Sequence, residues 1–403
     1  VDEAALAGSL RRWRPTIGDV DVLVATERPR SVTETLTDWD RVESVVESGP
    51  TKSTLRVAGM QVDVRQVDPA EFGSALVYFT GSKAHNIVLR NRAIDRSRKV
   101  NEYGVFEVTD AERADPDTRA GDRVAGETEE GVYEALDLPY IPPELREDRG
   151  EVAAADAGTL PDLLEEGDMR GDLHAHTTWS DGEATIEEMI EGAAAFGHDY
   201  LVISDHAAGP GVVADTGLTD DQLRDQLGAI EDAAADAEIE VLTSVEANVA
   251  PDGSIGDTDR DLLAELDLVV ASPHADLRDG SDRTDRLVAA VEDPLVDVLG
   301  HPSGRLLNER PAMEFDPGAL GAAAAKHGVA LEVNANPHRL DLWGAAVAAA
   351  IDEGATIAID TDAHDPSKFS YLRYGVHTAR RGWATKADVL NARDVDGLWA
   401  FLE

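Results

Sequence analysis

The sequence contains no cysteine, which excludes disulfide bonds and thiolate metal sites. It has no apolar run long enough to span a bilayer, and Val1 to Leu10 lack the basic and apolar regions of a secretory signal. These absences predict a soluble cytoplasmic protein. The chain has 403 residues, of which 42% are hydrophobic, and this is enough for two or three domains with buried cores.

Basic side chains are also few. The sequence has 36 Lys and Arg against 80 Asp and Glu, which gives a formal net charge of -44. Lysine is scarce and the acids occur in every segment, a pattern typical of proteins from a salt-rich cytoplasm. At ~1 M salt the Debye length is only about 3 Å, so local basic patches decide whether an anionic partner binds. The net charge therefore does not exclude DNA as a partner.

The first part of the chain divides into three regions by pattern. Residues 1–68 alternate apolar with polar positions, as in Asp19 to Ala25 and Leu55 to Val67, which predicts strands and turns. Residues 69–147 mix helical and irregular patterns and end in the proline-rich LPYIPPELRE. Residues 148–168 are acidic and rich in alanine, which predicts a linker or a helix with a turn.

From Gly171 onward, short apolar strands alternate with amphipathic helical stretches. Seven strands are predicted, beginning near Asp172, Tyr200, Ile239, Asp267, Leu295, Val329 and Ala355. Repeated strand–helix units predict a parallel sheet, and seven of them favour a closed α/β barrel over residues 169–403.

Histidines and carboxylates gather at the ends of these predicted strands. One histidine at a strand end is usually structural, but six of the eleven histidines follow this pattern. Strand ends in a barrel meet on one face, so we expect nine ligands there: His174, His176, Asp181, His206, Glu246, His274, His301, Asp362 and His364. Imidazole and carboxylate without thiolate suit Mn²⁺, Zn²⁺ or Fe²⁺. The other histidines are interpreted as structural: His85, His198, His327, His338 and His377.

A second group of carboxylates lies in the first region. Asp19 and Asp21 are spaced i,i+2 on a predicted strand, and Asp63 lies on a neighbouring one. An isolated DxD pair is weak evidence in so acidic a chain. Three converging carboxylates would repel one another without cations, and two Mg²⁺ ions would relieve that repulsion.

Several motifs of the second half resemble those of the polymerase and histidinol phosphatase (PHP) domain: GDLHAHTTWSDG, VISDH, SVEAN, SPH, GHPSG and DTDAH. The resemblance implies a distorted seven-stranded barrel with a trinuclear metal site that hydrolyses phosphate esters. It assigns His174, His176, Glu246 and Asp362 to one ion. Glu246 would bridge to a second ion on His274 and His301, and Asp181, His206 and His364 would hold the third. Arg305, just after GHPSG, is either a contact to substrate phosphate or a surface arginine.

The first half resembles the palm and thumb of family X DNA polymerases in AGSLRRWRPTIGDVDVL, VDVR and YFTGSKAHNIVLR. The resemblance implies a partial α+β palm at residues 1–68 and a thumb at 69–147, with Asp19, Asp21 and Asp63 as catalytic carboxylates. It also implies contacts to the incoming deoxynucleoside triphosphate from Gly8, Ser9, Arg12, Gly18, Tyr78, Phe79, Gly81 and Asn86. The basic stretch from Lys83 to Lys99 is suited to contact DNA phosphate. The alternative is that it forms a solvated helix face.

Together, the two resemblances imply a DNA repair polymerase with a 3′–5′ exonuclease or 3′-end phosphoesterase, acting on primer 3′ ends and short gaps. Relatives carry DNA-gripping helix-hairpin-helix elements ahead of the palm that this sequence does not include, so we expect weak nucleotide addition. Two alternatives remain: a small-molecule phosphatase of the histidinol-phosphatase type, and a barrel that acts as a scaffold without catalysis.

Overall fold

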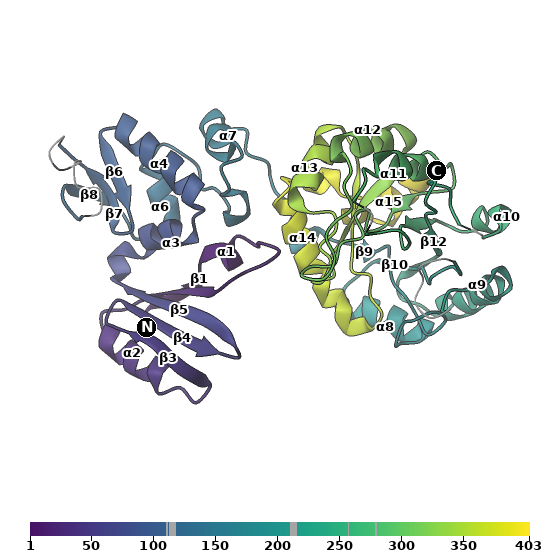
Figure 1. Ribbon diagram of the computed structural model, residues 1–403, viewed down its shortest axis with the longest axis horizontal. Coiled ribbons are helices and arrows are strands. Elements are labelled where there is room, and N and C mark those ends of the chain that lie inside the picture. Colours follow the sequence, from purple (N-terminus) through teal and green to yellow (C-terminus); the bar gives the residue numbers. More distant parts are fainter. Residues whose placement is uncertain (110–111, 113–117, 210–215, 257, 279) are drawn as a thin grey trace. The chain divides into compact units, whose positions relative to one another are not determined.

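The computed structural model describes residues 1–403 except 110–111, 113–117, 210–215, 257 and 279. The chain forms two compact units, Val1–Leu160 and Pro161–Glu403, drawn in purple to blue and in teal to yellow in Figure 1. The boundary between the units falls inside the alanine-rich segment 148–168. This segment contains helix α7 (Glu151–Ala157).

The first unit begins with a five-stranded sheet in the order β1-β2-β5-β4-β3. Its strands are β1 (Glu3–Leu6), β2 (Val20–Ala25), β3 (Val42–Ser48), β4 (Lys52–Val57) and β5 (Met60–Val67), with helices α1 (Gly8–Arg11) and α2 (Pro29–Thr37). Strands β2 and β5 pair in parallel and the other pairs are antiparallel. The alternating stretch Leu55 to Val67 is two strands, because Ala58 and Gly59 adopt left-handed conformations with φ of 50° and 75° and reverse the chain.

Helices and a small antiparallel sheet complete the first unit. They are η1 (Pro69–Glu71), α3 (Phe72–Thr80), α4 (Lys83–Asp95), β6 (Arg98–Asn101), β7 (Gly104–Glu107), β8 (Asp122–Ala125), α6 (Glu129–Glu134) and η2 (Pro143–Leu145). The fully buried Arg146 donates from Nη1 to Glu129 Oε1 at 2.7 Å, and Arg11 of α1 binds both oxygens of the same carboxylate. The attraction between these opposite charges offsets the cost of removing them from water. The same contacts join α1 to α6.

The second unit contains two parallel sheets, in the orders β11-β10-β9 and β12-β13-β14-β15-β16. The strands are β9 (Gly171–Asp172), β10 (Tyr200–Ile203), β11 (Glu240–Thr243), β12 (Glu246–Asn248), β13 (Val270–Ser272), β14 (Val298–Leu299), β15 (Ala330–Asn334) and β16 (Ile357–Asp360). Parallel bridges connect His206 with Glu246 and Ala175 with Ala363, so the two sheets meet along both edges. Strands β11 and β12 follow each other in one segment. The result is seven strand positions in sequence order around a distorted, closed sheet, and the predicted α/β architecture is confirmed.

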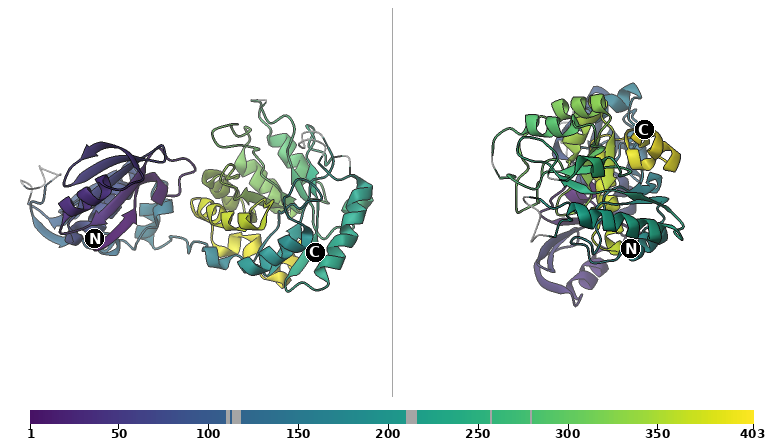
Figure 2. Two further views of the ribbon diagram at one scale, coloured as in Figure 1. Left: turned by 90° about the horizontal axis from the view of Figure 1, so that it is seen from below. Right: turned by 90° about the vertical axis from the view of Figure 1, so that its right-hand side faces the viewer.

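Helices cover the outside of this sheet in all views of Figures 1 and 2. They are α8 (Ile186–Phe196), α9 (Asp220–Ala234), α10 (Arg260–Leu263), α11 (Thr284–Val291), α12 (Pro317–His327), α13 (Gly344–Asp352), α14 (Leu372–Arg380) and α15 (Val395–Leu402), with the short turns η3 (Glu166–Asp168), η5 (Pro366–Tyr371), η6 (Lys386–Asp388) and η7 (Leu390–Ala392). Helix α8 illustrates how the sequence sets these boundaries. Thr185 and Glu188 form a capping box at its start, and Gly197 ends it in a left-handed conformation.

The parallel strands bring their carboxyl ends to one face of the barrel. Strand β14 has only two residues, and Gly300 follows it directly. A Cβ atom on Gly300 would lie 2.2 Å from Ser272 Oγ at the end of β13. Glycine at this position therefore leaves room for the Ser272 side chain, immediately before His301.

Candidate metal centres and active sites

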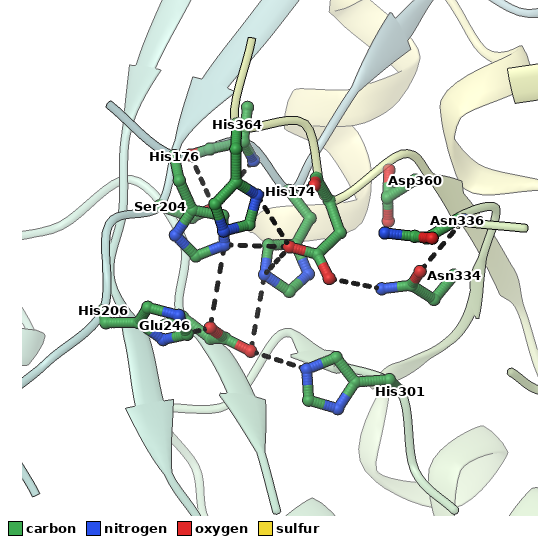
Figure 3. Close-up of polar contacts among 12 residues, drawn as sticks. His174, His176, Ser204, His206, Glu246, His301, Asn334, Asn336, Asp360 and His364 are labelled. Atoms are coloured by element: carbon green, nitrogen blue, oxygen red, sulfur yellow. Dashed lines mark hydrogen bonds and ion pairs between the residues drawn. The ribbon is translucent and has the colours of Figure 1, made fainter. Parts of the chain in front are cut away.

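All nine predicted ligands lie at this carboxyl-end face. His174 and His176 follow β9, Asp181 lies in the next turn, and His206 follows β10. Glu246 begins β12, while His274 and His301 follow β13 and β14. Asp362 and His364 follow β16. Side chains from six strand positions thus converge, as Figure 3 shows for most of them.

Glu246 is the centre of this cluster and is fully buried. Its Oε2 lies 2.6 Å from His206 Nδ1, and its Oε1 lies 2.9 Å from His301 Nε2. Three more imidazole nitrogens lie within 4 Å of its two oxygens: those of His274 at 3.3 Å, His174 at 3.4 Å and His176 at 3.8 Å. One carboxylate therefore faces five imidazoles at once, and Figure 3 shows those of His174, His176, His206 and His301.

Two further carboxylates extend the cluster. Asp362 Oδ1 lies 3.1 Å from His176 Nε2. Asp181 lies between two imidazoles, at 3.5 Å from His206 Nε2 and 3.3 Å from His364 Nε2. His206 thus faces both Glu246 and Asp181, so it connects the two ends of the cluster.

The cluster has the character of a cation site. Several of its buried nitrogen and oxygen atoms have no hydrogen-bond partner: His174 Nε2, both ring nitrogens of His176, His206 Nδ1, both oxygens of Glu246, His274 Nε2 and His301 Nδ1. Buried polar atoms normally have partners, and ligation would supply them to the atoms that face the centre of the cluster. Three overlapping groups bring their ligand atoms within 4.8 Å of one another: His174, His176 and Glu246; His206, Glu246 and His274; and His176, Asp181, His206 and His364. The donor set fits divalent cations.

These groups differ in detail from the division expected from the sequence. His206 belongs with Glu246 and His274 as well as with Asp181 and His364. His176 also lies in two groups. His301 and Asp362 contact the cluster directly, through Glu246 and His176 respectively.

The charges of the cluster shift its protonation in opposite directions. Burial opposes protonation of His206, yet Glu246 and Asp181 outweigh it and raise the pKa of His206 to about 10. Burial, followed by the positive charges of His206 and His364, lowers the pKa of His176 to about 4. Burial alone would raise the pKa of Glu246, but the surrounding histidines hold it well below its usual range. Protons and metal ions therefore compete for the same nitrogens.

The first unit holds the second carboxylate group. Asp21 of β2 pairs directly with Asp63 of β5, and Asp19 immediately precedes β2. Oxygens of the three carboxylates lie within 4.8 Å of one another. Burial raises the pKa of Asp21, and the negative charges of Asp19 and Asp63 raise it further. Mutual repulsion of this kind favours bound cations.

Comparison with known proteins finds similarities for both units. Residues 75–147 match the family model of the DNA polymerase beta thumb, and residues 172–335 match that of the PHP domain. A Bacillus subtilis (strain 168) protein named DNA polymerase/3′-5′ exonuclease PolX is 39% identical over 98% of this chain and 68% of its own length. The chain belongs to the family X DNA polymerases that carry a PHP domain.

Two other similarities each cover one part of the chain. A Shewanella sediminis (strain HAW-EB3) protein named "Probable phosphatase" is 31% identical over 48% of this chain and 77% of its own length. A crystal structure of Leishmania infantum polymerase beta in a ternary complex is 27% identical, with a TM-score of 0.30, over 36% of this chain and 67% of that chain. Polymerase and PHP domains both use divalent metal ions, which agrees with the two carboxylate-rich groups. Within the described residues, no helix is long and apolar enough to cross a membrane.

Glycine at position 8 is required by the carboxylate group of this family X chain. Gly8 begins α1 with a φ of 63°, and a Cβ atom there would lie 2.0 Å from Asp21 Oδ2. A side chain at position 8 would therefore collide with the Asp21 carboxylate. Asp63 is held from its other side, since Thr54 Oγ1 donates to its Oδ1 at 2.6 Å and Lys52 Nζ lies 3.4 Å from its Oδ2.

Five of the eight predicted nucleotide-binding residues lie on helices of the first unit, and Arg12, Gly18 and Gly81 lie outside them. Gly8 and Ser9 belong to α1, which Arg12 directly follows, and Tyr78 and Phe79 belong to α3. Arg12 Nη1 donates to Thr80 O and would lie 3.3 Å from a Cβ atom on Gly81, so α1 contacts the end of α3. Asn86 of α4 donates to Tyr78 O at 2.8 Å. Gly18 has open space around its Cα, immediately before Asp19.

The basic stretch Lys83 to Lys99 is mostly engaged within the unit. Arg92 donates to the carbonyls of Leu136 and Asp137 and lies 2.5 Å from Asp156. Arg96 pairs with Asp137 at 2.7 Å. Lys99 is buried, and Arg98 donates to Ala135 O. These contacts tie Arg92, Arg96 and Arg98 to the following segment, while Lys83 at the start of α4 is exposed. Contact of this stretch with DNA phosphate stays a prediction.

Residues that support the barrel cluster were not predicted. Glu332 Oε1 lies 2.7 Å from His174 Nδ1, and Asn248 Oδ1 lies 2.7 Å from His274 Nδ1. Asn334 Nδ2 donates to Asp362 Oδ2 at 3.0 Å. A sequence signal did exist: Glu332 and Asn334 are polar at i,i+2 on a predicted strand to which no ligand was assigned. Such partners fix the tautomer and orientation of metal-binding histidines.

Asp205 anchors the turn that carries Asp181. Its buried carboxylate accepts from Thr177 N at 2.8 Å and Thr177 Oγ1 at 2.7 Å, and also from Ser180 Oγ and Gln226 Nε2. The turn between His176 and Asp181 is therefore tied to the end of β10.

Arg305 has a structural position. It donates from Nε to Arg339 O at 2.7 Å and also to Leu340 O, and its guanidinium lies 5.5 Å from the centre of the Trp343 ring. Its side chain therefore joins two loops instead of facing the cluster. Arg339 is the arginine beside the ligands, with Nε 3.5 Å from Asp362 Oδ2.

Proposed function

We propose that the barrel is a metal-dependent phosphoesterase acting on DNA, as a 3′–5′ exonuclease or 3′-end phosphoesterase. The observation that carries this proposal is the buried Glu246 with five imidazoles around it. A buried carboxylate in such surroundings is typical of a ligand that bridges two cations. The name of the Bacillus subtilis relative, which includes 3′-5′ exonuclease, supports DNA as the substrate.

The nine residues of the cluster would hold three divalent ions, Mn²⁺ or Zn²⁺. Bound ions of this kind lower the pKa of a water molecule and stabilise negative charge on phosphate oxygens. Glu246 would bridge, and His206 lies where it can serve either neighbouring ion. Glu332 and Asn248 would accept a hydrogen bond from Nδ1 of His174 and His274, respectively. Each histidine would then carry its proton on Nδ1, and its Nε2, which faces Glu246, would be free to bind a metal ion. Asp205 fixes Asp181 through the turn.

We further propose that the first unit transfers nucleotides. Residues 1–68 would form the palm and 69–147 the thumb, with 148–168 leading to the barrel at 169–403. Asp19, Asp21 and Asp63 would hold two Mg²⁺ ions, and the incoming deoxynucleoside triphosphate would lie near Gly8, Ser9, Arg12, Gly18, Tyr78, Phe79, Gly81 and Asn86. The close approach of Gly8 to Asp21 supports this arrangement. Both sites would act in DNA repair, and the net charge of -44 would be compatible with a cytoplasm of high salt concentration.

The decisive experiment measures both activities on one substrate. The purified chain is incubated at high salt with Mn²⁺ and a 5′-labelled duplex with a recessed 3′ end, with and without nucleotides. We expect shortening of the label-bearing strand without nucleotides, and its loss in Glu246→Gln. The matched control is Glu240→Gln, an exposed glutamate of β11. Equal shortening by Glu246→Gln and wild type would refute the assignment.

A small-molecule phosphatase is the second candidate, because the Shewanella sediminis protein named "Probable phosphatase" is similar to 48% of this chain. This candidate predicts a higher kcat/KM for phosphomonoesters such as histidinol phosphate than for an oligonucleotide. The DNA proposal predicts the reverse order, so one pair of measurements on the same preparation decides between them.

A further inference from the structure

Three consecutive loops at the carboxyl-end face each carry an arginine. Arg278 follows His274 in the loop after β13, Arg310 lies in the loop after His301 and β14, and Arg339 lies in the loop after β15. These strands are neighbours in the sheet. The three arginines therefore lie on adjacent loops of one face, in a chain with a net charge of -44.

Arg339 lies next to the predicted ligands. Its Nε is 3.5 Å from Asp362 Oδ2, whereas Asp362 Oδ1 is 3.1 Å from His176 Nε2. The two oxygens of Asp362 thus face different partners, with the cluster on one side and Arg339 on the other. The Arg339 side chain is 20% exposed, so a ligand can reach it.

Arg310 lies on a loop that contacts the loops of both other arginines. Leu307 N donates to His338 O at 2.7 Å, and a Cβ atom on Gly304 would lie 2.8 Å from the Leu277 side chain. Arg310 Nε donates to Gly304 O at 2.7 Å, which fixes the direction of the guanidinium. Burial lowers the pKa of Arg310, and the positive charges of Arg339 and Arg278 lower it further, against smaller opposing effects of Asp341 and Glu309. Like charges placed together repel one another, and an anion between them would relieve that repulsion.

We propose that Arg339, Arg310 and Arg278 form a clamp for two successive phosphates of a nucleic acid strand. Arg339, beside Asp362, holds the phosphate that is hydrolysed. Arg310 and Arg278, farther along the adjacent loops, hold the next phosphodiester. Guanidinium groups suit this task because they donate two parallel hydrogen bonds to phosphate oxygens.

The clamp explains how the barrel would prefer a DNA end to a phosphomonoester, since a substrate with one phosphate engages only Arg339. It rests on the proposed nuclease function. Arg305 is excluded from the clamp because its guanidinium binds the carbonyls of Arg339 and Leu340.

The test compares two substrates that differ in the number of phosphates. One is a single-stranded oligonucleotide, and the other is the p-nitrophenyl ester of thymidine 5′-monophosphate, which has one phosphodiester. Arg310→Gln and Arg278→Gln should each raise KM for the oligonucleotide about 10-fold, within the range for a lost charged contact. Both variants should leave kcat and KM for the small ester unchanged, and Arg310→Lys should recover part of the loss.

The matched control is Arg224→Gln, an exposed arginine of α9 paired with Asp221 and Asp259. The dependence of log kcat/KM on log salt should become shallower by about 0.7 for each removed contact to a single strand. Equal losses on both substrates, or unchanged KM for the oligonucleotide, would overturn the clamp.

Binding separates failure of the clamp from failure of the proposed function. If neither substrate is hydrolysed by wild type, the nuclease proposal fails. Fluorescence anisotropy of the labelled oligonucleotide in EDTA still tests the arginines. Weaker binding by Arg310→Gln than by Arg224→Gln supports the clamp, and equal binding overturns it.

Discussion

Replacing Glu332 by glutamine tests whether the barrel cluster depends on a carboxylate that is not itself a predicted ligand. Both oxygens of Glu332 accept hydrogen bonds: Oε1 from His174 Nδ1 at 2.7 Å, and Oε2 from His301 N and Asn334 Nδ2. Every partner is a donor. A glutamine must place its amide NH₂ group against one of these donors, whichever way the amide is turned.

Each orientation of the glutamine has a cost. With NH₂ at the Oε2 position, the buried N–H of His301 loses its acceptor. With NH₂ at the Oε1 position, His174 must accept at Nδ1 and carry its proton on Nε2, the nitrogen that faces Glu246 at 3.4 Å. A protonated Nε2 cannot bind a metal ion. Losses of such supporting contacts weaken metal binding by about 10–100-fold, equivalent to about 1.4–2.7 kcal/mol.

The assay measures Mn²⁺ binding to chelator-stripped protein by isothermal titration calorimetry. This measurement does not depend on catalytic turnover. We expect Glu332→Gln to lose affinity for at least one ion by about 10–100-fold. The control is Glu353→Gln, an exposed glutamate directly after α13. If Glu332→Gln binds Mn²⁺ with the affinity and stoichiometry of Glu353→Gln, Glu332 does not orient His174 and the reasoning is wrong.

Other predictions address the first unit and the independence of the two sites. Gly8→Ala should reduce nucleotide addition at least 10-fold, because a Cβ atom would lie 2.0 Å from Asp21 Oδ2, while hydrolysis of 3′ ends stays at the wild-type rate. Asp21→Asn should abolish nucleotide addition and leave hydrolysis intact, and His176→Ala should do the reverse. If either change removes both activities while circular dichroism shows a preserved fold, the two sites are coupled. Burial lowers the pKa of His85 below 6.5, so the neutral imidazole is favoured in the folded state. The free energy of unfolding should therefore fall as the pH drops below 6.5, because the unfolded chain then binds a proton more readily than the folded one. Urea unfolding at pH 7.5 and pH 5 should show this loss, and His85→Asn should reduce the difference; an equal difference in both proteins would exclude His85 as its source.

The local pattern of apolar and polar residues predicted much of the architecture. The i,i+2 spacing of His174 with His176 and of Asp19 with Asp21 put each pair on one face of an extended segment, because side chains alternate along a strand. The strand–helix rhythm after Gly171 predicted the α/β unit, since parallel strands require crossover connections. The turn at Ala58 and Gly59 was missed because apolar alternation continues through it on both sides.

Contacts between distant segments could not be read from spacing. Whether His206 faces Glu246, Asp181 or both depends on how β10, β12 and the turn after His176 approach one another. The sequence analysis named Arg305 for phosphate, but the loop geometry commits Arg305 to two carbonyls and places Arg339 beside Asp362.

The sequence by itself determined which residue types reach the carboxyl-end face, because strand periodicity and parallel topology are set locally. Tertiary structure alone decided which of them touch. Glu332 illustrates the difference: its position on β15 was predictable, but its hydrogen bonds to His174 and to the backbone of His301 join segments 158 and 31 residues away. Such contacts are fixed only when the sheet closes, since closure sets distances that no repeat of two or 3.6 residues encodes.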